Sequence, residues 1–108
     1  MGGEKARASR MRMMMKVTVD IDKGNEAVRG GRMPEIMKGA LEALKPEAAY
    51  FGPEGGQRTC WMVLDLQDSS QLPPTAEPFF EELNAKVEFT PVMNAEDLQK
   101  GLSQLRGA

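Results

Sequence analysis

The 108-residue sequence predicts one small α+β domain built on an antiparallel four-stranded sheet. Two observations support this fold class. Residues 11–21 and 58–66 have the composition of strands, whereas residues 34–45 and 95–105 carry apolar residues at helical spacing. Strand and helix patterns then follow one another in the order β-α-β-β-α-β-α. We expect residues 11–108 to form this domain, and residues 1–10, which lack apolar periodicity, to be a disordered tail.

The first strand is predicted from strict alternation in the stretch MRMMMKVTVDI, residues 11–21. Its odd positions are all apolar, and successive side chains of a strand point to opposite faces. We expect the methionines on the odd face to fill a core, because Met is unbranched and adaptable. The alternative is a thioether site for a soft metal such as Cu(I).

Two helices and a hairpin should follow. Residues 22–45 have a helical pattern that Gly30 and Gly31 interrupt, and Pro34 suits the first turn of the second helix. Residues 48–52 form a short strand, the turn-rich stretch PEGGQ follows, and residues 58–66 form a strand that is apolar on both faces. We expect a hairpin with a loop of about five residues.

The last third should contain a helix, a strand and a helix. Pro73 and Pro74 suit the start of the first of these helices. Proline inside a helix costs about 3 kcal/mol, so this helix either begins near Pro78 or kinks there. Residues 85–93 form the fourth strand, in which Pro91 implies an edge position or a bulge. Asn94 should cap the last helix, whose stripe is Leu98, Leu102 and Leu105.

This order predicts a ferredoxin-like βαββαβ sheet plus a terminal helix, with the first and third strands central and the helices on one face. The other face stays open. It should carry Arg12, Met14, Lys16, Thr18, Tyr50, Thr59, Trp61, Val63, Lys86, Glu88, Thr90 and Val92. These include too many apolar side chains for a solvated face. We therefore expect a homodimer in which two such faces close into a barrel.

Composition excludes several kinds of chemistry. The chain has no histidine and one cysteine, which rules out a Ser-His-Asp system, histidine-ligated haem and thiolate zinc sites. We expect no cofactor and no metal. A net charge of −2 argues against nucleic acid as the main partner, although residues 1–16 are basic. With no long apolar segment and no internal disulfide, we expect a cytoplasmic protein that is not embedded in a membrane.

The stretches LKPEAAYF, AEPFF and KVEFTPVMNAEDL resemble those of uncharacterised bacterial members of the dimeric α/β-barrel superfamily. That group includes antibiotic-biosynthesis monooxygenases, muconolactone isomerases, YciI-like proteins and haem-binding chlorite dismutases. The resemblance covers roughly residues 11–105 and implies a dimeric barrel. The histidine-centred sites of the haem-binding and YciI-like members cannot be carried over to a chain without histidine.

The resemblance and the open face together suggest a pocket for a small hydrophobic or aromatic metabolite. Candidate ligand-binding residues are Trp61, Tyr50, Lys16, Thr18, Glu88 and Arg58. Trp61 is either a core or interface aromatic or the wall for a flat ligand. Lys16 and Glu88 form either a cross-strand ion pair or a buried acid–base pair. The alternative function is a non-catalytic interaction domain whose sheet face is only a dimer interface.

Overall fold

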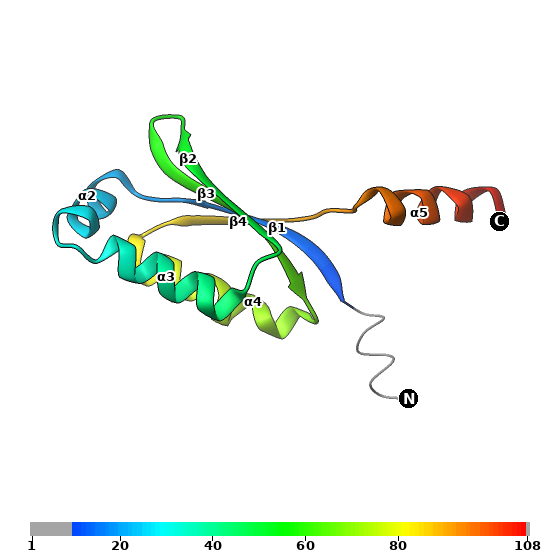
Figure 1. Cartoon of the computed structure of the whole chain (residues 1–108), viewed down its shortest axis with the longest axis horizontal. Helices are drawn as coiled ribbons and strands as arrows, with labels where there is room; N and C mark the ends of the chain where they lie inside the picture. Colours follow the sequence, from blue (N-terminus) through cyan, green and yellow to red (C-terminus); the bar gives the residue numbers. More distant parts are fainter. Residues whose placement is uncertain (1–9, 108) are drawn as a thin grey trace.

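The computed structural model describes residues 10–107 and contains the predicted α+β fold (Figure 1). One antiparallel sheet has the strand order β2-β3-β1-β4, so the first and third strands are central, as predicted. Its strands are β1 (Met11–Thr18), β2 (Ala48–Glu54), β3 (Gln57–Leu66) and β4 (Lys86–Pro91). The helices are α2 (Ile21–Arg29), α3 (Met33–Leu44), α4 (Leu72–Leu83) and α5 (Ala95–Gly107), with a short 3-10 turn η1 (Ser69–Gln71). The prediction for residues 1–9 lies outside the described residues.

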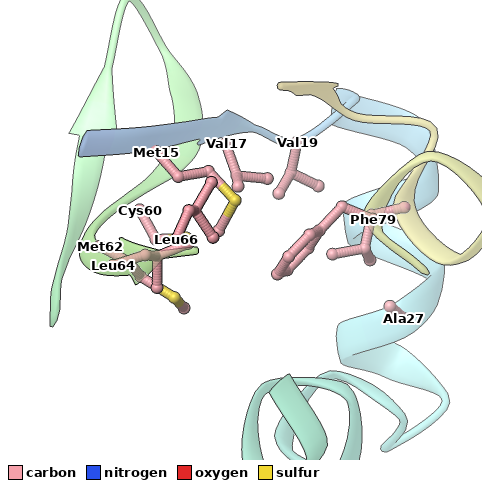
Figure 2. Packing of buried hydrophobic residues seen from close by; sticks show 10 residues of the cluster. Met15, Val17, Val19, Ala27, Cys60, Met62, Leu64, Leu66 and Phe79 are labelled. Carbon is pink, nitrogen blue, oxygen red and sulfur yellow. The ribbon is translucent and has the colours of Figure 1, made fainter. Parts of the chain in front are cut away.

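The helix-covered face of the sheet carries the core. Figure 2 shows Met15 and Val17 of β1 and neighbouring side chains of β3 pointing toward Phe79 of α4. Met15, Val17 and Met62 are fully buried there, which confirms that the alternating methionines pack as core residues. On the helical side of this core, α4 contributes Phe79 and α2 contributes Ala27. The apolar stripe of α3 packs against the same cluster but stays only partly buried.

Three boundaries differ from the prediction. The first strand stops at Thr18, because Asp20 caps α2 by accepting a hydrogen bond from the Lys23 backbone at 3.0 Å. The hairpin loop is Gly55 and Gly56 alone, rather than five residues. Both have positive φ (61° and 80°), which is the requirement of the tightest hairpin turn.

The third difference concerns α4, which starts at Leu72 and continues through Pro78. Pro73 and Pro74 lie in its first turn, as expected, where their missing N–H groups cost nothing. Of the two alternatives for Pro78, a helix start at that residue is therefore wrong. Pro91 ends β4, which is an edge strand, as predicted.

The last helix is capped as predicted. The Asp97 backbone donates to Asn94 Oδ1 at 2.8 Å, and the Asn94 backbone donates to Asp97 Oδ2 at 3.3 Å. α5 does not join the helical layer, however, and projects away from the sheet (Figure 1). No helix within residues 10–107 is long and apolar enough to cross a membrane.

Candidate functional site

The open face of the sheet carries a row of four side chains that crosses all four strands. Strand register places Tyr50 of β2 opposite Trp61 of β3, Trp61 opposite Lys16 of β1, and Lys16 opposite Glu88 of β4. Directly opposite residues on one face of a sheet contact each other. Four of the six predicted site residues therefore lie in one line, with two aromatic side chains at one end and two charged ones at the other.

Two further rows flank this line. Toward the hairpin turn, Thr18 lies between Thr59 and Lys86. Toward the other end of the strands, Met14 lies between Val63 and Thr90, and Val63 pairs with Ala48. The open face thus has an apolar strip on one side of the central row and a hydroxyl-rich strip on the other.

The aromatic end of the row is accessible. Tyr50 is 70% exposed and Trp61 is half-buried. Gly52, also on β2, lies beside the indole, because a Cβ built there would be in ordinary contact with Trp61 Cζ3 at 3.9 Å. A partly exposed indole offers the flat apolar surface on which an aromatic ligand can stack.

Lys16 pairs with a different carboxylate from the one expected. Its ammonium Nζ contacts Glu54 of β2 rather than Glu88. The hydrogen bond that Lys16 donates to Glu54 raises the pKa of Lys16; desolvation lowers this pKa, and the negative charges of Glu54 and Glu88 raise it further. The raised pKa keeps Lys16 protonated at neutral pH, so it can hold an anion or donate a hydrogen bond but cannot act as a base.

A depression of about 340 Å³ adjoins this ion pair at the hairpin end of the face. Its lining combines ammonium, carboxylate, amide and hydroxyl groups: Lys16, Thr18, Asp20, Glu54, Gly55, Gln57, Asn84, Lys86 and Glu88. Three predicted site residues, Lys16, Thr18 and Glu88, are among them. Trp61 and Tyr50 are not part of this lining, and lie beside it in the same row as Lys16.

The sequence analysis missed Glu54 and Gln57 as site residues because it ended the second strand at Gly52. The usable signal was parity, since Glu54 is two residues beyond Gly52 and four beyond Tyr50, on the same face of β2. Lys86 was placed on the open face but was not named as a site residue, although it is two residues before Glu88.

Arg58 does not join this site. It donates through one guanidinium nitrogen to Asn25 Oδ1 at 3.0 Å, and lies against Gly24 of α2. It belongs to a separate cleft of about 370 Å³ on the helix side of the hairpin, together with Met33, Met37 and Phe51. Even-numbered residues of β3 face the helices, so the position of Arg58 follows from the same alternation that buries Cys60 and Met62.

Cys60 also lines that helix-side cleft, but its thiol is a poor nucleophile. Its side chain is 3% exposed, and burial raises the pKa of the thiol to about 11. The reactive form of cysteine is the thiolate, which is scarce at neutral pH when the pKa is this high. We assign Cys60 to the core.

A second group of charges occupies the far end of the open face. Arg12 donates to Glu47 at 2.8 Å and to Asp97 at 3.0 Å, and Arg10 donates to Asp65 at 3.2 Å. The hydrogen bond with Glu47 and the nearby carboxylates raise the pKa of Arg12. Within residues 10–107, no group of three or more cysteine and carboxylate side chains is arranged to hold a metal ion.

Comparison with known proteins identifies the family. A protein-family model described as "Domain of unknown function (DUF3303)" matches residues 11–106. The chain belongs to this family. No curated protein sequence matches it.

Two solved structures are similar to this member of the DUF3303 family. The uncharacterized protein TM1266 from Thermotoga maritima is 13% identical, with a TM-score of 0.52, over 78% of this chain and 99% of that protein. An unknown protein from Galdieria sulphuraria is 11% identical, with a TM-score of 0.49, over 80% of this chain and 47% of that one. The likeness to the Thermotoga protein is a likeness of fold alone.

Proposed function

We propose that the protein is a homodimer that binds a small hydrophobic or aromatic molecule at the open sheet face without a metal. The observation that carries this proposal is the row Tyr50–Trp61–Lys16–Glu88, which places two aromatic surfaces in line with an ammonium and a carboxylate. Binding sites for small molecules commonly combine apolar walls with a few polar groups that fix orientation.

Dimer formation is part of the proposal because the face is incomplete in one chain. Tyr50 is largely exposed, and Met14 and Val63 form an apolar strip beside it. A second sheet packed about 10 Å away would cover the strip and convert the open row into an enclosed site. The resemblance of the sequence to dimeric α/β barrels points to the same arrangement.

The charges indicate which polar group the ligand would carry. Lys16 and Lys86 both line the depression next to the aromatic row. Because Lys16 stays protonated, it can donate to an anionic or carbonyl oxygen of a ligand that takes the place of Glu54. Asp20, Glu54 and Glu88 line the same depression, so the preference for an anion comes from Lys16 and not from the net charge of the lining. If the site is catalytic, any proton acceptor has to be a carboxylate, and Glu54 and Glu88 are the nearest candidates.

A second function is favoured by a different observation. The depression beside Lys16 does not include Trp61 or Tyr50 in its lining. A face that is filled completely by a second chain would leave no pocket beside the aromatic rings. In that case the protein is a non-catalytic interaction domain, and the row is only part of a dimer interface.

The dimer is tested by Val63→Glu, which places a charge against its symmetry partner in the apolar strip. Light scattering on the wild type should give about twice 11.9 kDa. The variant should run as a monomer, with red-shifted emission from Trp61, the only tryptophan. Lys38→Glu, at an exposed position of α3, is the control and should remain a dimer. A monomeric wild type with Trp61 already shielded would contradict the proposal.

Ligand binding is tested with benzoate and benzamide, read by quenching of Trp61 emission. We expect saturable quenching by both probes, with benzoate at least threefold tighter because of Lys16. Lys16→Met should abolish the preference for the carboxylate while keeping the ring contact. A dimeric wild type that binds neither probe would favour the interaction domain.

A further inference from the structure

Helix α5 leaves the body of the protein with its apolar stripe uncovered. Every residue from Met93 to Leu105 is exposed, including Leu98 at 44%, Leu102 at 53% and Leu105 at 74%. The chain measures 56 × 31 × 17 Å, and the projecting helix forms one end of its long axis (Figure 1). A helix of 13 residues is about 20 Å long, which accounts for much of this elongation.

The helix is well specified, but its leucines stay exposed in the part of the chain that the structure describes. Asn94 and Asp97 form a reciprocal cap at its start, so its position in the sequence is fixed. A helix of this length is marginal in water without tertiary contacts, and most of its stability must come from burying its apolar face. Leu98, Leu102 and Leu105 follow the spacing of such a face.

The start of α5 is attached to the rim of the open sheet face. Arg12, which lies on that face, donates to Asp97 at 3.0 Å, and its backbone carbonyl accepts from Val92 at 3.1 Å. The first turn of α5 is therefore anchored at the end of the open face where Arg12 lies, one row of side chains beyond the strip around Met14 and Val63.

We propose that α5 of each chain packs its leucines against the open sheet face of a second copy, at the end marked by Arg12. This inference rests on the dimer in the proposed function and deepens it. Sheets that pack face to face are about 10 Å apart, and a helix is about 10 Å wide, so a helix fits as the end wall between them. Two different surfaces that cover each other reciprocally give a closed two-fold dimer.

The area required for a stable dimer favours this arrangement. Four strands about 4.8 Å apart and eight residues long give a face of about 19 Å by 26 Å, or roughly 500 Å². A standard interface buries about 800 Å² per partner, so the sheet face alone falls short. Contact along α5, about 20 Å by 10 Å, adds on the order of 200 Å² and brings the total to about 700 Å² per partner, which is within the usual range of about 600–1,000 Å².

The arrangement also predicts the end of the open face at which a ligand would enter the site. α5 lies at the Arg12 end of the face, whereas the depression with Lys16, Glu54 and Lys86 lies at the hairpin end. An exchanged α5 would close the end of the site near Arg12 and leave the hairpin end open as the entrance. Ligands then reach the aromatic row past the charged groups.

The first test substitutes the stripe, with Leu98→Gln, Leu102→Gln and Leu105→Gln in the full chain. The control is Gln99→Ala with Ser103→Ala, on other sides of the same helix. By light scattering across a dilution series, the stripe variant should raise the dimer Kd at least 100-fold, and the control should change it less than threefold. Circular dichroism checks that the sheet domain stays folded, and a chain ending at Asn94 serves as a second variant.

The outcomes separate this inference from the proposed function. If both α5 variants and the wild type are equally tight dimers, the exchange is wrong and the dimer proposal stands. If the wild type is a monomer, both are wrong.

The second test shows which chain the helix packs on. Leu102→Cys in one chain and Met14→Cys in another are mixed in a Cys60→Ala background and oxidised. If α5 is exchanged, a disulfide should form between the two chains. With Ser103→Cys in place of Leu102→Cys, the yield of cross-linked dimer should be at least tenfold lower. A disulfide that forms only within one chain carrying both substitutions would show that α5 folds back on its own sheet, and would overturn the exchange.

Discussion

The two faces of the sheet use the same alternation of residues for different purposes. On the helix-covered face, Met15 and Met62 are fully buried members of one core. On the open face, their sequence neighbours Lys16 and Trp61 remain partly exposed. Consecutive residues of one strand thus belong to environments that differ in water content and in tolerance of charge.

This difference shows how a small sheet can separate stability from a binding surface. The covered face has few alternatives, because protein interiors are close-packed and respond to the loss of single methylene groups. The open face can carry ion pairs and aromatic side chains at little cost in folding free energy. We expect substitutions on the two faces to have distinct effects on stability and on association.

The largest contrast should come from Leu64 and Val63, adjacent residues of β3 that point to opposite faces. Leu64 is buried, so Leu64→Ala should lower the free energy of unfolding by about 2–5 kcal/mol. Val63 is only half-buried, so Val63→Ala should cost about 1 kcal/mol or less in the isolated chain. Urea denaturation at several protein concentrations measures both.

The concentration series sharpens this comparison. If Val63 lies in a dimer interface, the effect of Val63→Ala should grow with protein concentration, since association stabilises the folded state by mass action. The effect of Leu64→Ala should keep its size. Equal losses at both positions and all concentrations would mean that the open face is part of a single core.

The next effect is a pH dependence that belongs to the covered face. The pKa of Cys60 is raised to about 11 by burial, against about 8.5 in an unfolded chain. The folded state therefore holds the proton more tightly. Its contribution to stability is complete below about pH 8.5 and is lost as the pH rises through about 11.

We expect this loss to reach about 2–3 kcal/mol between pH 8.5 and 11. Denaturation of the wild type and of Cys60→Ala across this range isolates the contribution of the thiol, because every other side chain is the same in both proteins. The difference in unfolding free energy between the two should shift in favour of Cys60→Ala as the pH rises. Parallel pH profiles would show that the thiol titrates normally in the folded protein.

The sequence was sufficient to predict the sheet and its faces, for a physical reason. Alternation has a period of two, so one buried position such as Met15 determines which face of the sheet each remaining residue of its strand points to. The positions of Tyr50, Trp61, Lys16 and Glu88 on one face follow from four such assignments. Their alignment in one row depends on register, which the two-residue turn at Gly55 and Gly56 fixes.

The ion-pair partner of Lys16 and the placement of α5 could not be predicted in this way, because alternation determines neither how far a side chain reaches nor where a helix packs. Lys16 has a long flexible side chain, and its choice of Glu54 over Glu88 required the true length of β2. The projection of α5 was also not predictable, because an amphipathic stripe shows that a helix needs a partner without showing which one.

The smallest effect on stability should come from the charged half of the open row. Lys16→Met removes the ion pair with Glu54, and both side chains are partly exposed, so competing hydration cancels most of its value. We expect the Tm to change by no more than about two degrees at pH 7, and less in 0.5 M salt. Differential scanning calorimetry measures this change, with Glu54→Gln as the matched control from the other side of the pair. A fall of several degrees in both variants would mean that Lys16 and Glu54 hold the hairpin against β1. The open face would then contribute to folding as the covered face does, and the separation between the two would be lost. A small change in Tm together with lost preference for benzoate would instead assign Lys16 to binding alone.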